Sequence, residues 1–246
     1  MNWGYYKEIW EDLSIKIPIK HDISTHCHAL ITGSSGSGKS YALLYLLGQL
    51  LKFEPDTEIY FCDFKNSEDF AFLSGLPHFY SGNDCYRGIM EFYQSFTDAR
   101  ITGENRSRHV LICDEYPAFV NYLQMQDKAN KTKYANDILG AVSEVLMLGR
   151  GIEYGIWIVT QRADSSLFSN GTRDNFMLIV ALGRLSKEQK AMLFSGENIP
   201  DSINKQGEGL LLADGSPLCS VKYPRIINTE DWKKHILSAI RRCGGA

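Results

Sequence analysis

The sequence predicts an α/β fold in which a mainly parallel central sheet is covered by helices on both faces and is followed by a C-terminal β-hairpin. Three observations support this prediction. Runs rich in Val, Ile and Leu alternate with segments of helical periodicity, a glycine-rich loop joins the first run to the first helix, and 44% of the 246 residues are hydrophobic. Strands that are apolar on both faces and separated by helices are typical of a buried parallel sheet. A chain of this length can bury one substantial core, so we expect one compact domain.

The expected parallel strands are apolar runs bounded by polar or turn residues, and they lie at residues 28–33, 57–64, 109–115, 154–161 and 176–183. Between them, apolar residues recur at helical spacing. This spacing predicts helices from residue 39, at residues 86–100 and around residues 135–146. Strand and helix therefore alternate over most of the chain.

The pattern changes near the C-terminus. Residues 209–213 and 217–223 flank the turn Asp214-Gly215 and predict a hairpin at the edge of the sheet. A terminal helix is expected at residues 229–242, with Thr229 as its N-cap. Residues 121–133 are polar, rich in lysine and aperiodic, which predicts an exposed loop.

Residues 33–40 fit the phosphate-loop pattern G-x-x-x-x-G-K-[ST], placed after an apolar strand and at the start of a helix. The glycines let backbone N–H groups turn toward phosphates, and the helix N-terminus adds positive potential. We expect Lys39 to reach the β- and γ-phosphates of ATP and the Ser40 hydroxyl to ligate Mg²⁺. A turn that only caps a helix would explain the glycines but not the Lys-Ser pair. The expected ATP-binding residues are Gly33, Ser34, Ser35, Gly36, Ser37, Gly38, Lys39, Ser40, Tyr41 and Asp114.

The strand at residues 109–115 ends in two acidic residues, Asp114 and Glu115. Ligands of open parallel sheets collect at the carboxyl ends of the strands, so Asp114 is placed to hold Mg²⁺ through water. Glu115 is suited to polarise an attacking water, which makes it the expected catalytic base. Gln161 ends the next strand, and its amide is placed to contact the γ-phosphate and that water. The alternative for Asp114 and Glu115 is that they are only solvated charges at the end of a strand. The alternative for Gln161 is that it is only a polar residue at a strand terminus.

Charge and composition limit the location and the partners of the chain. The formal net charge is −3, so nucleic-acid binding requires a local basic surface or an assembled ring. Six cysteines occur without a C-x-x-C pair, which favours reduced thiols. The longest apolar run, residues 42–51, is about half of what a bilayer requires, and no signal peptide is recognisable. We therefore expect a cytoplasmic protein.

Seven motifs, taken in order, resemble the motor domain of the FtsK/SpoIIIE family of DNA translocases. They span residues 17–224 and read IPIKHDI, HALITGSSGSGKS, IYFCDFK, LPHF, HVLICDE, GRGIEYGIWIVTQR and GEGLLLADGSPLCSVKYP. The compact form is most similar to the coupling ATPases of Gram-positive conjugative elements. The resemblance implies a RecA-like P-loop NTPase fold and a hexameric ring that pulls double-stranded DNA through its centre. We expect residues 28–246 to form this motor and residues 1–27 to form a lead-in segment packed on it.

The resemblance also implies that an arginine of one subunit completes the ATP site of its neighbour. Arg150 in LGRG is the first candidate and Arg173 in NGTRDNF the second. Such an arginine finger contributes several orders of magnitude in rate. The alternative for Arg150 is an exposed cation that interacts with a helix dipole.

The expected DNA contacts are the loop at residues 163–175 and three lysines, Lys128, Lys131 and Lys133. A merely solvated loop is the alternative for the lysines. The chain departs from the family at Ala163, where a proline usually follows TQR, and in lacking the usual membrane anchor and winged-helix domain. We therefore also expect a membrane-anchored or relaxosome partner.

The leading function is an ATPase that pumps double-stranded DNA, in conjugative transfer or chromosome partitioning. Type VII secretion ATPases share the fold and the order of motifs, so a protein-secretion motor is one alternative. Another is a non-motor module in which ATP only switches assembly, although the presence of Glu115 argues against it. Stimulation of hydrolysis by DNA would separate the first two.

Overall fold

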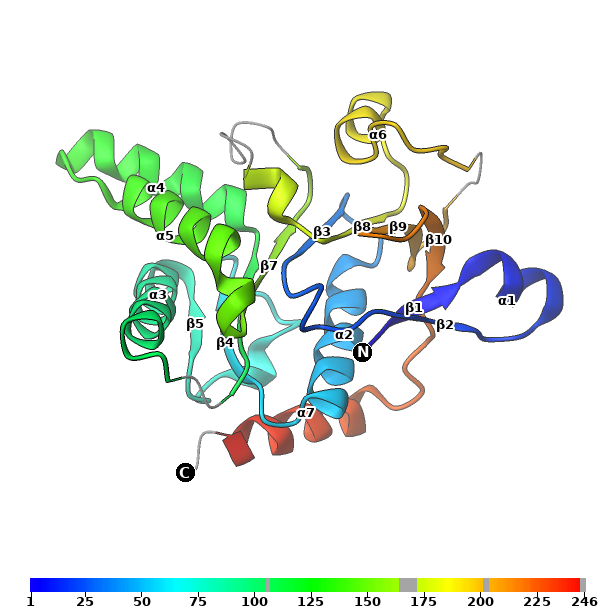
Figure 1. Cartoon of the computed structure of the whole chain (residues 1–246), viewed down its shortest axis with the longest axis horizontal. Coiled ribbons are helices and arrows are strands. Elements are labelled where there is room, and N and C mark those ends of the chain that lie inside the picture. Colours follow the sequence, from blue (N-terminus) through cyan, green and yellow to red (C-terminus); the bar gives the residue numbers. More distant parts are fainter. Residues whose placement is uncertain (105–106, 164–171, 201–203, 244–246) are drawn as a thin grey trace.

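A large central sheet organises the molecule, and helices cover both of its faces (Figure 1). The computed structural model describes residues 1–104, 107–163, 172–200 and 204–243. Within these ranges the sheet has ten strands, in the order β2-β1-β10-β9-β8-β3-β7-β6-β4-β5. The strands are β1 (Asn2–Tyr6), β2 (Pro18–Lys20), β3 (Ala29–Gly33), β4 (Glu58–Asp63), β5 (Phe79–Ser81), β6 (His109–Asp114), β7 (Tyr154–Thr160), β8 (Leu178–Leu182), β9 (Glu208–Ala213) and β10 (Cys219–Lys222).

Two separate apolar cores lie on the two faces of the sheet. The helices are α1 (Lys7–Leu13), α2 (Lys39–Phe53), α3 (Cys85–Thr102), α4 (Tyr116–Asn130), α5 (Tyr134–Leu148), α6 (Lys187–Leu193) and α7 (Thr229–Cys243). Helices α2 and α7 contribute to one core, and α3, α4 and α5 contribute to the other. No helix among the described residues is both long and apolar enough to span a membrane.

The predicted fold class, a mainly parallel sheet covered by helices, is confirmed by six of the ten described strands. Strands β8, β3, β7, β6, β4 and β5 run parallel to one another, and β8 pairs antiparallel with β9 on its other side. The five strands expected from apolar runs are all present, each within two residues of its expected bounds. Since these strands are buried on both faces, their sequences are apolar throughout and mark them clearly.

The hairpin β9–β10 is present, but its predicted place at the edge of the sheet is wrong. Strand β1 pairs antiparallel with β10, Tyr5 opposite Lys222, and β2 continues the sheet beyond β1. The N-terminal strand is held by Trp3, which is fully buried and packs on Trp157 with ring centroids 5.1 Å apart. Strands β1 and β2 therefore extend the sheet beyond the hairpin.

The exposed loop predicted at residues 121–133 is also wrong, because α4 continues to Asn130. Phe119, Val120 and Leu123 bury one face of this helix, and the polar residues form its solvent-facing side. A short turn then leads into α5, whose first N–H groups are capped by Asp127: its carboxylate accepts from the N–H of Ala135 at 2.8 Å. A helix with a narrow apolar face was misread as a loop.

The N-cap of α7 is Asn228 and not Thr229. The Asn228 side-chain oxygen accepts a hydrogen bond from the N–H of Asp231 at 3.1 Å, three residues further on. This contact is the usual N-cap geometry. The helix begins at Thr229, as predicted, so only the capping residue was assigned wrongly.

Candidate nucleotide-binding site

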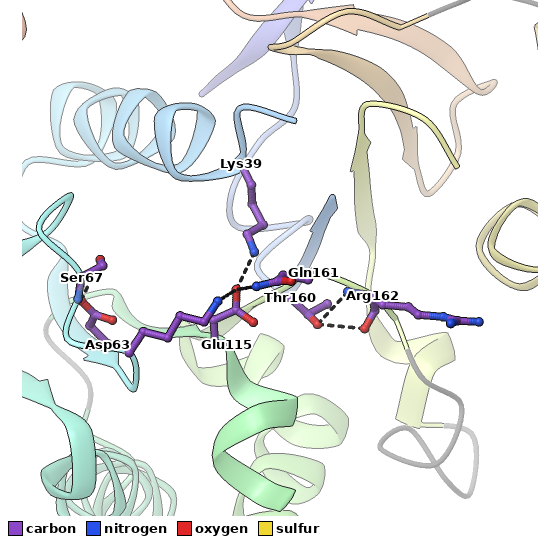
Figure 2. A network of polar contacts seen from close by, with 8 residues as sticks. Lys39, Asp63, Ser67, Glu115, Thr160, Gln161 and Arg162 are labelled. Carbon is purple, nitrogen blue, oxygen red and sulfur yellow. Dashed lines mark hydrogen bonds and ion pairs between the residues drawn. The ribbon is translucent and has the colours of Figure 1, made fainter. Parts of the chain in front are cut away.

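The candidate site lies where four parallel strands end. Gly33 ends β3, Asp63 ends β4, Asp114 ends β6, and Gln161 follows the last residue of β7. Parallel pairing brings these ends to one edge of the sheet, where open α/β folds bind their ligands. Figure 2 shows the side chains of Lys39 and Gln161 meeting at Glu115.

The phosphate loop connects β3 to α2 through two glycines in left-handed conformation, Gly36 at φ 79° and Gly38 at φ 91°. A Cβ on Gly38 would lie 2.8 Å from the backbone nitrogen of Gly207, so no larger residue fits there. That nitrogen also donates to the carbonyl of Ser37 at 2.8 Å. The loop is therefore shaped by its glycines and braced from behind by the turn before β9.

A cavity of about 310 Å³ opens over this loop. Seven of the predicted ATP-binding residues line it, together with Glu115 and Gln161, whereas Gly33, Ser37 and Asp114 are buried behind the surface. Sequence reasoning did not assign three further lining residues, Lys65, Asp69 and Gln206. The complete lining is Ser34, Ser35, Gly36, Gly38, Lys39, Ser40, Tyr41, Lys65, Asp69, Glu115, Gln161 and Gln206.

Glu115 is the centre of the polar network. Its Oε1 atom accepts from Lys39 Nζ at 2.7 Å, from Lys65 Nζ at 2.9 Å and from Gln161 Nε2 at 3.2 Å. The residue adopts a left-handed backbone, φ 58° and ψ 37°, between the end of β6 and the start of α4. Burial alone would raise its pKa, but the hydrogen bonds from the two lysines and Gln161 outweigh burial and hold the pKa below the ordinary value. Glu115 is therefore ionised at neutral pH.

Asp114 has the opposite environment although it is the adjacent residue. It is only 6% exposed. Burial raises its pKa to about 7, Lys39 partly opposes this, and the charges of Glu115 and Asp63 reinforce it. Asp63 is fully buried in the neighbouring strand, paired in register with Asp114.

The donor set fits a divalent cation. One Asp63 oxygen accepts from the Ser67 N–H at 2.7 Å, while its other oxygen, Oδ1, is buried and has no hydrogen-bond partner among the described residues. Two buried carboxyl groups at adjacent strand ends, one of them with an oxygen that has no partner among the described residues, favour a positive charge between them and the cavity. Oxygen ligands such as these and the Ser40 hydroxyl are those that Mg²⁺ prefers.

The structure does not bring Arg150, the first candidate finger arginine, into this site. Arg150 is exposed in a 3₁₀ turn, Gly149–Ile152, just before β7. The seven residues of β7 separate it from Gln161, a distance of about 20 Å at roughly 3.3 Å per residue. Arg173 lies in the short turn Thr172–Asn175; its side chain is outside the described parts of the chain.

The predicted DNA-contacting lysines are also remote from the cavity. Lys128, Lys131 and Lys133 are exposed where α4 turns into α5, at the tip of a helical hairpin that points away from the sheet (Figure 1). In the loop predicted at residues 163–175, Ala163 is buried, and residues 164–171 fall outside the described part of the chain.

A second cavity of about 600 Å³ carries a basic lining that sequence reasoning missed. Arg184, Lys187 and Lys190 line it, and no acidic residue of the described ranges, which omit residues 201–203, does. Gly183 belongs to its wall and also faces the phosphate loop, since a Cβ there would lie 2.9 Å from Ser37 Cβ. The three cations are spread from the residues after β8 to the last turn of α6, a pattern too short to stand out in the sequence.

Comparison with known proteins agrees with this fold. The FtsK/SpoIIIE family model matches residues 8–106. The FtsK domain-containing protein YdcQ of Bacillus subtilis is 30% identical over 198 residues, which cover 74% of this chain and 39% of that protein. The predicted resemblance to the FtsK/SpoIIIE family is confirmed. The chain spans about two fifths of the length of this curated relative.

Solved structures with little sequence identity share the fold. EssC (ATPases 2 and 3) from Geobacillus thermodenitrificans has a TM-score of 0.71 at 14% identity, and the match covers 99% of this chain and 49% of EssC. The pCW3 conjugation coupling protein TcpA, in a monomer form with ATPγS, has a TM-score of 0.68 at 20% identity over 90% of this chain and 67% of TcpA. Taken with the family match and the phosphate loop, these likenesses support an ATPase of the P-loop class.

Proposed function

We propose that this chain, similar to the FtsK/SpoIIIE family over residues 8–106, hydrolyses Mg-ATP to pump double-stranded DNA through a hexameric ring. The observation that carries the proposal is the convergence of Lys39, Glu115 and Gln161 on one cavity above a phosphate loop. Residues 28–246 form the motor in this proposal, and residues 1–27 form a lead-in segment. The cellular role is conjugative transfer or chromosome partitioning.

The phosphate loop and Asp114 hold the nucleotide and its metal. Backbone N–H groups between Ser34 and Ser40 surround the phosphates, and Lys39 donates to the β- and γ-phosphates. The Ser40 hydroxyl and Asp114 hold Mg²⁺, which neutralises charge on the phosphate oxygens. Tyr41 borders the same cavity and is fixed there, since its hydroxyl accepts a hydrogen bond from the backbone N–H of Ile226.

Glu115 and Gln161 act on the attacking water. The ionised Glu115 carboxylate accepts a proton from the water, and the Gln161 amide orients it toward the γ-phosphate. The 3.2 Å contact between their side chains supports this division of roles, because it places both groups beside one point of the cavity.

Arg150 completes the site of a neighbouring subunit in this proposal, and Arg173 is the second candidate. Arg150 is exposed at the end of β7 that lies away from its own phosphate loop. A cation in that place can reach a nucleotide only in another copy of the chain. Supply of an arginine across an interface would make hydrolysis depend on ring assembly.

Two sets of cations are candidates for contact with DNA phosphates. The first is the set expected from sequence, Lys128, Lys131 and Lys133 with the loop at residues 163–175. The second is the basic lining formed by Arg184, Lys187 and Lys190, and none of these three makes an ion pair within the described residues. Cations beside a wall that is shared with the phosphate loop can link contact with the DNA backbone to the nucleotide site.

The first experiment measures the steady-state ATPase rate with and without linear double-stranded DNA, at low salt and at protein concentrations at which rings form. We expect strong stimulation by DNA and a rate per subunit that rises with protein concentration. Replacing Arg184 and Lys187 by alanine should remove the stimulation and leave the basal rate near that of the wild type.

Basal hydrolysis without any stimulation would favour a protein-secretion motor instead. The observation that supports this second candidate is the likeness to the cytoplasmic domain of the Thermomonospora curvata Type VII secretion ATPase EccC, with a TM-score of 0.66 at 18% identity. A rate per subunit that does not change with concentration would contradict the ring. Absence of hydrolysis under all conditions would leave only the module in which ATP switches assembly with a partner.

A further inference from the structure

Lys65 makes a contact for which the roles proposed above leave no explanation. Its ammonium lies 2.9 Å from Glu115 Oε1, on the same carboxylate oxygen that Lys39 contacts at 2.7 Å. The Lys39 side chain is 9% exposed, whereas that of Lys65 is 46% exposed. One carboxylate oxygen therefore receives two ammonium groups that differ in freedom of movement.

The two lysines reach Glu115 from different elements. Lys39 comes from the first turn of α2, and Lys65 follows the end of β4 by two residues. Strands β4 and β6 are paired with Asp63 opposite Asp114, so the residues that follow each strand lie at the same edge. The register of the sheet brings Lys65 to Glu115.

The backbone around Lys65 is fixed although its side chain faces solvent. The Asp63 carboxylate accepts from the N–H of Ser67 at 2.7 Å and from its hydroxyl at 3.0 Å, and the Asn66 N–H donates to the Asp63 carbonyl at 3.2 Å (Figure 2). Asn66 adopts a left-handed conformation at φ 53°, which closes this turn. The turn fixes the base of the Lys65 side chain and leaves the ammonium able to move.

The proposed role of Lys39 competes with the contact seen here. Its ammonium is needed at the β- and γ-phosphates, and a group turned toward them loses its alignment with Glu115. The Glu115 side chain is only 8% exposed, and a buried carboxylate without a cationic partner is strongly disfavoured. Lys65 is the second cation that contacts Glu115 among the described residues.

We propose that Lys65 is a positioning residue that holds the Glu115 carboxylate toward the attacking water when the phosphates engage Lys39. This inference rests on the proposed ATPase function and deepens it. Lys65 acts on hydrolysis through Glu115 and contributes little to binding of the nucleotide. Gln161, which follows β7, donates to the same Glu115 carboxylate. Since β6 lies between β7 and β4, the carboxylate is held from both sides.

The test compares Lys65→Met and Lys65→Arg with the wild type. For Lys65→Met we expect kcat to fall about 10- to 100-fold, part of the contribution of a general base, while KM for ATP and the affinity for ATPγS stay within about threefold. Lys65→Arg keeps a cation at the same place and should recover most of the lost rate. Lys52→Met is the matched control, because Lys52 is exposed in the last turn of α2, far from the cavity, and should leave both constants unchanged.

Three outcomes would overturn the inference: an unchanged or raised kcat in Lys65→Met, a raised KM with kcat unchanged, or no recovery in Lys65→Arg. Circular dichroism and ATPγS binding show that each variant is folded. Failure of the proposed function is distinguishable, because the wild type itself would then not hydrolyse ATP.

Discussion

Replacing Glu115 by glutamine removes one negative charge from the site and preserves its shape. The amide oxygen can still accept a hydrogen bond from Lys39 or Lys65, but it cannot take a proton from water. General bases contribute about 10²- to 10⁴-fold in rate, which corresponds to roughly 3–5 kcal/mol of activation free energy. The other carboxylate that lines the cavity, Asp69, is exposed and has no contact with Gln161 among the described residues. We therefore expect kcat to fall by about 10³-fold.

Nucleotide affinity should not fall in the same variant. Lys39 contacts Glu115 at 2.7 Å, and this ion pair must weaken when the ammonium turns to the phosphates. The glutamine removes that competition and makes the site more positive, so ATPγS should bind as tightly as to the wild type or more tightly. Phosphate release and calorimetric titration with ATPγS measure the two effects. Glu230→Gln, at an exposed position in the first turn of α7, is the control.

The assignment of Glu115 as the base would be refuted by a hydrolysis rate within about threefold of the wild type. This conclusion holds if Lys39→Ala abolishes nucleotide binding in the same assay, since the phosphate loop is then shown to be the site in use. Loss of ATPγS binding in Glu115→Gln would instead show that the carboxylate supports the site structurally.

Three further predictions concern other residues. The Glu208 carboxylate lies 3.0 Å from the ammonium of the buried Lys7. Burial would raise the pKa of Glu208, but a backbone hydrogen bond from Lys205 and the contacts with Lys7 and Lys222 outweigh it and lower the pKa to about 2. The ionised Glu208 carboxylate therefore contributes to the free energy of unfolding above the unfolded pKa of about 4.5, and this contribution is lost as the pH falls through about 2. Urea unfolding of Glu208→Gln should show a free energy of unfolding lower than that of the wild type by roughly 3 kcal/mol at pH 7, with no difference near pH 2. Arg150→Ala and Glu115→Gln should each be inactive alone but regain ATPase activity when mixed, whereas no recovery would mean that Arg150 does not act across an interface. Gln161→Ala should lower kcat about tenfold with KM unchanged, and a change in KM alone would contradict its role toward water.

The sequence was sufficient to predict the elements whose signal is local. The phosphate loop is a continuous motif, and β3, β6 and β7 are apolar on both faces, so their strand ends could be assigned before the sheet was known. The structure then brings Glu115 and Gln161 together, as expected for parallel strands that end at one edge. Whether these residues perform the proposed chemistry stays a prediction.

What the sequence left open depends on pairing between distant segments. Strand β1 is short and polar in part, and only its pairing with β10 and the burial of Trp3 make it a strand. The motif DFK contains Lys65, but its contact with Glu115 follows from the register of β4 on β6, which no local pattern encodes. Helix α4 was missed because its buried face is narrow and its polar face dominates residues 121–133.

The two adjacent carboxyl groups, Asp114 and Glu115, differ because β6 ends between them. Asp114 is the last residue of the strand and stays buried beside Asp63, whereas the left-handed backbone of Glu115 turns its side chain to the two lysines. A pair of carboxyl groups with pKa values pushed apart is typical of groups with separate roles. Glu115 already has cationic partners, and Asp114 is suited to receive one.

This difference has a consequence for stability. The pKa of Asp114 is raised from 3.8 to about 7, so without Mg²⁺ its burial destabilises the fold increasingly as the pH rises from about 4 through about 7. Above pH 7 the buried, ionised Asp114 lowers the free energy of unfolding by roughly 4 kcal/mol at most, at about 1.4 kcal/mol for each unit of pKa. Asp114→Asn should therefore unfold at higher urea concentrations than the wild type at pH 8 in EDTA, and the two should converge near pH 4. Addition of Mg²⁺ with ATPγS should stabilise the wild type and not the variant; equal stabilisation of both would mean that Asp114 does not hold the metal.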